Sequence, residues 1–148
     1  MDGSVVQHDG LFCPQNDEES RMKTINGFFK VLVVISVLTV VSGATQLVKP
    51  DFVLKIISGE TTATSTHFFA IVGMFMVLFG GAMLHALLSK KHHPVVVLWA
   101  ALQKLGAFAA VGLGVLNAIF SPLALLVAGF DLLSGILFII YWLSIKES

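Results

Sequence analysis

Four long apolar runs restrict what this chain can fold into. They cover about residues 28–48, 68–88, 95–120 and 123–143. Each is close to the ~20 residues that an α-helix needs to cross about 30 Å of hydrocarbon at 1.5 Å per residue. With 56% hydrophobic and 12% charged residues, the composition also lies outside the range of soluble globular domains. We therefore expect an integral membrane protein.

The Val-rich stretches of the first and third runs raise a β-strand alternative, which the membrane excludes. Isolated strands leave backbone groups unpaired in lipid, and four strands do not close a barrel. The predicted fold class is therefore all-α, a polytopic antiparallel bundle of four transmembrane helices. Because the links between them are very short, helices 68–88, 95–120 and 123–143 must be antiparallel neighbours. We divide the chain into a head, 1–27, and a membrane domain, 28–148.

Helix-terminal residues mark the ends of the runs. Thr66 is a candidate N-cap for the second helix, and Pro94 occupies a suitable first position for the third. Pro122 does the same for the fourth, behind Ser121. The longer link 49–65 leaves room for a short interfacial segment.

Charge is unevenly distributed, although the formal net charge is zero. Residues 1–20 contain five acidic residues and no lysine or arginine, a composition typical of a flexible solubilising arm. Docking of this acidic head on a partner is the alternative. The positive-inside rule predicts that both termini are cytoplasmic. That choice places Arg21, Lys23, Lys30, Lys90, Lys91 and Lys146 on the cytoplasmic side, against Lys49 and Lys55 on the other.

Two ionisable residues, Lys104 and Asp131, interrupt the third and fourth runs near their middles. A charge at the bilayer centre costs about 2.5–3.5 kcal/mol on insertion scales, so such residues usually face a partner or a cavity. Counting at 1.5 Å per residue, Lys104 lies about 15 Å from the cytoplasmic end of its helix, and Asp131 about 20 Å from the same end of the next. A lysine side chain bridges that difference. We therefore predict an ion pair between two antiparallel helices.

Small side chains share the helix faces of these two residues. The positions stacked with them are Val97, Ala100, Ala101, Ala107, Phe108 and Val111 for Lys104, and Ala124, Val127, Ala128, Ser134, Gly135 and Phe138 for Asp131. Small residues let helix backbones approach closely in lipid, so these faces predict an interface. Gln103 adds a further polar group to an intramembrane polar centre of Lys104, Asp131 and Gln103. A pair that fixes helix packing, a proton-labile or ligand-binding centre, and snorkelling of Lys104 alone remain open interpretations.

Further small residues form possible packing positions on the second and third helices. They are Gly73, Gly80 and Gly81, and then Gly106, Ala110 and Gly114. Together with Gly135, they would serve contacts with another helix of the chain or with another subunit.

His85, toward the cytoplasmic end of the second run, is the candidate contact for a ligand or cofactor. A lone histidine there can ligate haem or chlorophyll, although a satisfied bundle residue is the simpler interpretation. Motifs for phosphate binding, nucleophilic catalysis and zinc proteolysis do not occur, and no basic and aromatic patch suits nucleic acid. The sequence thus predicts no cofactor, metal site or nucleic-acid partner, and it argues against an enzyme.

Four segments carry a family resemblance: HFFAIVGMFMVLFGGAMLHALL, the short basic loop before Pro94, LQKLGAF and FDLLSGILFIIYW. Across about residues 50–143, they resemble the small four-helix bacterial membrane proteins grouped as DoxX-like. The resemblance implies a bacterial inner-membrane location. Because the group is associated with a membrane quinol oxidase, it also implies an accessory-subunit role. A quinone contact would rest on the resemblance alone, since no residue singled out above requires quinone chemistry.

Three hypotheses for function follow. The first is a structural or accessory subunit that contacts the bilayer and other membrane subunits, or a second copy of itself. The alternative is a small transporter or binder of protons or of a lipophilic or weakly ionic solute, centred on Lys104 and Asp131. The third is a membrane enzyme or cofactor holder with Asp131 as acid or base, or with His85 as axial ligand.

Overall fold

The computed structural model describes the backbone of residues 15–146 and the side chains of residues 27–146. This part of the chain consists of helices and turns, without strands: α1 (Gln15–Val48), α2 (Pro50–Ile56), α3 (Ala63–Leu88), α4 (Pro94–Leu116) and α5 (Ala124–Ile145). The predicted all-α fold class is confirmed. α1 begins within the segment assigned to the acidic head, and residues 1–14 of that head lie outside the described residues, so its flexibility stays a prediction.

Four of the helices are long and apolar enough to cross a bilayer: Gly27–Val48 within α1, and the whole of α3, α4 and α5. Only 22% to 33% of the most apolar stretch of each is buried within the chain. Large apolar side chains such as Leu116 and Leu126 are exposed instead. Exposure on this scale is unfavourable in water and favourable in hydrocarbon. The protein is therefore an integral membrane protein that contacts the bilayer through its outward faces.

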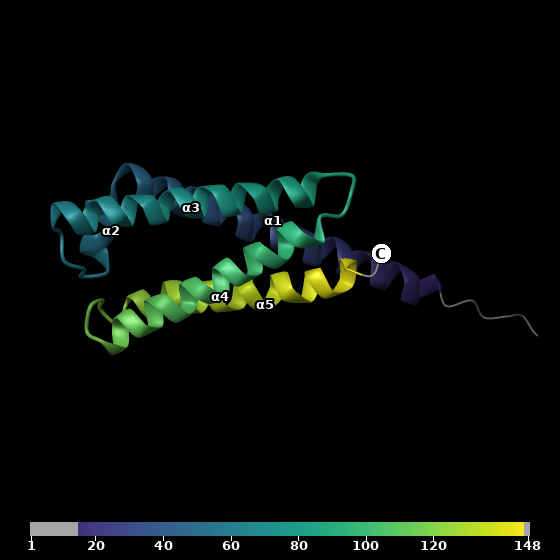
Figure 1. Ribbon diagram of the computed structural model, residues 1–148. Helices are drawn as coiled ribbons and strands as arrows, with labels where there is room; N and C mark the ends of the chain where they lie inside the picture. Colours follow the sequence, from purple (N-terminus) through teal and green to yellow (C-terminus); the bar gives the residue numbers. More distant parts are fainter. Residues whose placement is uncertain (1–14, 147–148) are drawn as a thin grey trace, which may run out of the picture.

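The helices form two antiparallel pairs, α1 with α3 and α4 with α5, which lie in two layers (Figure 1). Contacts between the layers are fewer, and they run from α3 to α4 and from α1 to α5. The short α2 packs on α1 and α3 at the end of the bundle far from the C-terminus. α1 begins and α5 ends at the same end, as an even number of crossings requires (Figure 1).

Glycines bring α1 and α3 into close contact. A Cβ added at Gly73 would lie 2.7 Å from the carbonyl oxygen of Gly43 and 2.7 Å from the backbone nitrogen of Leu47. One added at Gly80 would lie 2.9 Å from the side chain of Val40. Only hydrogen fits at these positions, and such close approach is a main source of helix association in lipid. Sequence analysis identified Gly73 and Gly80 as packing positions and missed Gly43 on the facing helix.

Matching turns end α2 and α4. In each, a residue without glycine's freedom, Ser58 or Ala118, adopts the left-handed conformation at φ 56°. Amides after the helix bond back to its last carbonyls, as in Gly59 N to Leu54 O at 2.8 Å and Ile119 N to Gly114 O at 2.8 Å. This is the Schellman pattern of helix termination. It ends α4 at Leu116, so the predicted range 95–120 extends too far.

The two turns meet at the α2 end of the bundle and join its layers. The amide of Ser121 donates to the carbonyl of Ile57 at 2.9 Å. Phe120 folds back over Gly114, where an added Cβ would lie 2.5 Å from the ring, and the same ring lies near Gly59. The two layers are therefore held at this end by one backbone hydrogen bond and one aromatic side chain.

Helix starts agree with prediction at only one of three sites. Pro94 is the first residue of α4, as expected. α3 is capped by Thr62, whose hydroxyl accepts from the amide of Ser65 in a capping box, so the prediction of Thr66 as N-cap is wrong. α5 begins at Ala124, after a turn in which the amide of Ala124 donates to Ser121 O. The prediction that Pro122 opens this helix is wrong by two positions.

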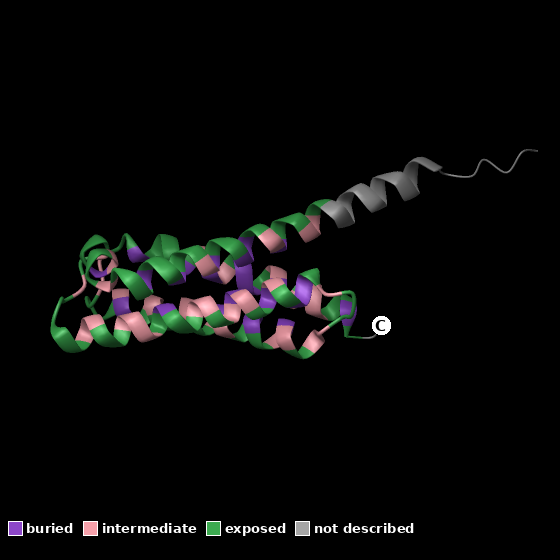
Figure 2. Ribbon diagram, turned by 90° about the horizontal axis from the view of Figure 1, so that it is seen from above, coloured by how far each residue is buried: buried purple, intermediate pink, exposed green. Residues whose placement is uncertain are grey.

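The apolar core lies where the two layers meet toward the end that carries the C-terminus. Its members come from all four long helices: Leu32, Ile35, Met83, Leu87, Val97, Ala100, Ala101, Phe138 and Ile145. Figure 2 shows buried residues on the inward helix faces and exposed residues on the outward ones. The bundle is thus closed by side-chain packing at one end and by the two turns at the other.

Substituting Gly73 by alanine should destabilise the bundle. The added methyl would overlap the backbone of α1 and force α1 and α3 apart, and overpacking of this kind costs about 1–3 kcal/mol. The free energy of unfolding in mixed micelles, followed by circular dichroism, measures the effect. Gly81→Ala is the matched control, because a Cβ there meets nothing within 4 Å. Equal stability of the two variants would contradict the close crossing.

Candidate functional site

Lys104 and Asp131 form an ion pair between α4 and α5 in the interior of the bundle. The ammonium nitrogen Nζ donates to Asp131 Oδ1 at 2.6 Å, and the side chains are 2% and 6% exposed. The residues that the depth argument pairs thus lie together. Burial removes both charges from water at a cost in free energy. The attraction between the paired charges offsets this cost, which an unpaired charge at either residue would leave uncompensated. Whether it has any function beyond packing stays a prediction.

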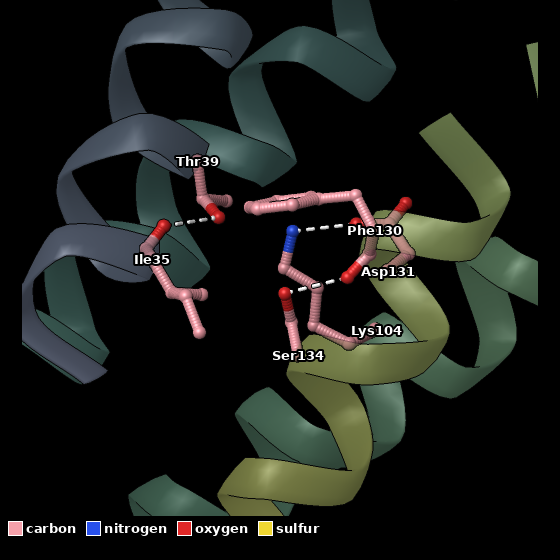
Figure 3. Close-up of polar contacts among 6 residues, drawn as sticks. All are labelled: Ile35, Thr39, Lys104, Phe130, Asp131 and Ser134. Atoms are coloured by element: carbon pink, nitrogen blue, oxygen red, sulfur yellow. Dashed lines mark hydrogen bonds and ion pairs between the residues drawn. The ribbon is translucent and has the colours of Figure 1, made fainter. Parts of the chain in front are cut away.

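Phe130 and Ser134 complete the α5 side of the site. The ammonium group lies 5.1 Å from the centroid of the Phe130 ring, within cation–π distance. Figure 3 shows this ring covering the ammonium group while Thr39 approaches from α1. The Ser134 hydroxyl donates to the carbonyl of Phe130 at 2.6 Å and is buried. The cation therefore has one carboxylate and one aromatic face as neighbours, and the adjacent serine is satisfied by its own helix.

α1 supplies polar side chains that sequence analysis missed. Ser36 and Thr39 are both buried, and their hydroxyls donate to Leu32 O and Ile35 O, each at 2.9 Å. They share one helix face. The available signal was polar residues spaced three to four positions apart within an apolar run. That face is turned toward Lys104.

The polar groups of both layers line one narrow space between the helix pairs. Ser36 and Thr39 face Gln103 and Lys104 across it, with Gly80 on α3 closing one side. The space is too narrow to admit a water molecule. A buried water needs both room and polar partners, and this space provides the polar partners without the room. Such an arrangement holds charge but offers no volume for a solute.

A second polar contact inside the membrane joins α1 to α3. The Gln46 amide nitrogen Nε2 donates to the carbonyl of Phe69 at 3.0 Å, and Gln46 is buried. Interhelical side-chain hydrogen bonds of this type contribute about 0.6–2 kcal/mol in membrane proteins. Sequence analysis missed Gln46 as well, although it lies on the same polar face of α1 as Ser36 and Thr39.

The small residues singled out from the sequence are placed in different environments. Gly135 packs against Leu105, and Gly114 lies beneath Phe120. At Gly81 and Gly106, by contrast, an added Cβ would meet nothing within 4 Å, and Ala110 is exposed. Gly106 and Ala110 therefore leave a smooth outward strip on α4, whereas the buried glycines serve contacts within the chain.

Two further predicted positions lie on the surface of the bundle. Val127, expected on the face of Asp131, is exposed, while the other predicted members of that face are buried. His85 is exposed in the last turn of α3, away from the ion pair. Within the described residues no group of three or more His, Cys, Asp or Glu side chains is placed to hold a metal ion. A haem, chlorophyll or quinone contact stays untested.

Comparisons with known proteins do not assign the chain. No family model, no curated protein and no solved structure matches it. The DoxX-like resemblance therefore stays a prediction, and the site has to be interpreted from its own geometry.

Replacing Lys104 alone by methionine should strongly destabilise the bundle. The change leaves the Asp131 carboxylate buried without its partner, and breaking a buried pair in this way costs about 3–5 kcal/mol. The free energy of unfolding in mixed micelles is the measurement. Lys49→Met is the control, because that side chain is exposed and the change should stay within about 0.5 kcal/mol. Equal effects of the two substitutions would show that the buried pair does not hold α4 and α5 together.

Proposed function

We propose that this integral membrane protein is a structural or accessory subunit of a larger membrane assembly. The observation that carries the proposal is the closed state of its charged centre: Lys104 and Asp131 are paired at 2.6 Å beside a space too narrow for water. A paired centre beside a space without room for water suits a fixed packing role better than the passage of a solute. The exposed strip at Gly106 and Ala110 supports a partner, because small residues allow another helix to approach closely.

The proposal includes a location. The DoxX-like resemblance favours a bacterial inner membrane, and the lysines of the α3–α4 loop favour the cytoplasm for the end of the bundle that carries the C-terminus. The partner would then be another membrane subunit of that compartment.

Photo-crosslinking in the native membrane tests the proposal. A crosslinking residue at position 110 on α4 should give one discrete adduct with another membrane protein. Position 126 on α5, where Leu126 is 72% exposed, is the control and should react with lipid alone. Lys104→Met combined with Asp131→Leu should keep the adduct, because a buried pair can be replaced by apolar residues without loss of packing.

Three results would count against an accessory subunit. The first is that position 110 reacts with lipid only, as position 126 does. The adduct would contain nothing but a second copy, which indicates self-association. The double variant would fold with the same free energy of unfolding as the natural chain and yet lose its assembly, which indicates that the charges act and do not merely pack.

A small transporter or binder of protons, or of a lipophilic or weakly ionic solute, is the second candidate. The gathering of Ser36, Thr39 and Gln103 beside Lys104 favours it, since polar groups from both layers could line a path once the space between them widens. Asp131→Asn should then abolish pH-dependent flux in proteoliposomes while the bundle remains folded. Ser134→Ala is the control, because that hydroxyl bonds only its own helix. Flux that is unchanged in Asp131→Asn would exclude this candidate.

A further inference from the structure

A surface hollow of about 530 Å³ lies between α2 and the start of α3, remote from the ion pair. Its polar lining comes from both elements and the link between them: Asp51, Lys55, Thr61, Thr62, Thr66 and His67. This volume lies within the ~300–1,000 Å³ typical of small-molecule sites. In Figure 1 α2 lies beside the beginning of α3, at the end of the bundle far from the C-terminus. A hollow here opens where the membrane-spanning part of α3 begins.

The lining offers one cation, one anion and several unused polar groups. Lys55 Nζ lies 3.9 Å from Asp51 Oδ2, one helical turn away, and both side chains are more than half exposed. Thr62 is occupied by the capping box with Ser65. For Thr61, Thr66 and His67, no side-chain hydrogen bond forms with the described residues. A loose ion pair and free hydroxyl and imidazole groups are available to a ligand.

Apolar side chains lie beside the hollow. Phe52 of α2 and Phe68 of α3 are both exposed, next to lining residues of their own helices. Ala63 and Ala70 form part of the wall. A ligand with a charged end and a hydrocarbon end would place the first in the hollow and the second along these side chains.

We propose that the hollow binds the headgroup of a zwitterionic phospholipid of the phosphoethanolamine class. Lys55, with the hydroxyl of Thr66 and the imidazole of His67, donates to the phosphate, and Asp51 accepts from the primary ammonium group. Asp51 and Lys55 are four residues apart, about 6 Å along the helix axis. Their charged atoms lie 3.9 Å from each other, so the two side chains can contact two opposite charges joined by a two-carbon linker.

The charge pattern distinguishes this headgroup from others. An anionic lipid such as phosphatidylglycerol brings phosphate without an ammonium group and leaves Asp51 facing like charge. Phosphatidylcholine carries both charges, but its trimethylated nitrogen cannot donate a hydrogen bond to the carboxylate. The expected order of affinity is therefore phosphatidylethanolamine, then phosphatidylcholine, then phosphatidylglycerol. The site is independent of the accessory role and of the central ion pair.

Native mass spectrometry of the delipidated full chain in detergent, titrated with dioleoyl forms of these three lipids, tests the proposal. Phosphatidylethanolamine should bind about fivefold more tightly than phosphatidylglycerol, the ratio for about 1 kcal/mol per charge near a membrane surface. Lys55→Met and Asp51→Asn should each weaken its binding by about the same factor. Lys49→Met and Glu60→Gln are matched controls, because these neighbours do not line the hollow.

Three results would overturn the assignment. Equal or tighter binding of phosphatidylglycerol would show that the hollow does not select the headgroup. Equal affinities of the lining and control variants for phosphatidylethanolamine would show the same. Water-soluble O-phosphoethanolamine should compete only in large excess, since it lacks the hydrocarbon that lies along Phe52 and Phe68. Competition at the same concentration as the lipid would identify a soluble ligand instead. Lys104→Met with Asp131→Leu should leave lipid binding unchanged, which separates this site from the proposed subunit role.

Discussion

Backbone N–H and C=O groups find no hydrogen-bond partners in hydrocarbon, so each segment that crosses the membrane must satisfy them within its own helix. Lipid tails are as apolar as leucine, and helices therefore gain little by covering one another's apolar side chains. A bundle is therefore held together by close approach of helix backbones and by pairing of polar groups. The α1–α3 pair depends mainly on close backbone approach, through Gly43 and Gly73. The α4–α5 pair adds a pairing of polar groups, between Lys104 and Asp131.

The number and approximate limits of the spans could be predicted because the thickness of the bilayer sets the length of apolar sequence that each span needs. Helix ends could not, because they depend on local geometry that composition does not specify. Ala118 is an ordinary helix former, yet it adopts the left-handed conformation that ends α4 at Leu116. Four threonines precede or open α3, and Thr62 is the cap because its hydroxyl and that of Ser65 satisfy each other's backbone amides.

The pairing of Lys104 with Asp131 could be predicted because depth is a one-dimensional quantity, and two charges at similar depth on adjacent antiparallel helices have few other partners. The contribution of α1 is of another kind. Ser36 and Thr39 satisfy their hydroxyls with their own helix, as serine and threonine commonly do, so nothing in their local sequence demands a partner. They face Lys104 because of how the two helix pairs stack on each other. The depth of a residue along its helix does not specify that stacking.

The stacking also limits what the ion pair can specify. Both of its members belong to one hairpin, α4 and α5, and within residues 27–145 no side-chain hydrogen bond or ion pair links these helices to α1 or α3. The pair therefore fixes the register of α4 against α5 but not the position of one layer on the other. That position depends on the apolar core at one end and on Ser121 and Ile57 at the other. A charge pair that is central in depth is thus local in the fold, and its exchange for apolar side chains removes no hydrogen bond or ion pair between the layers within residues 27–145.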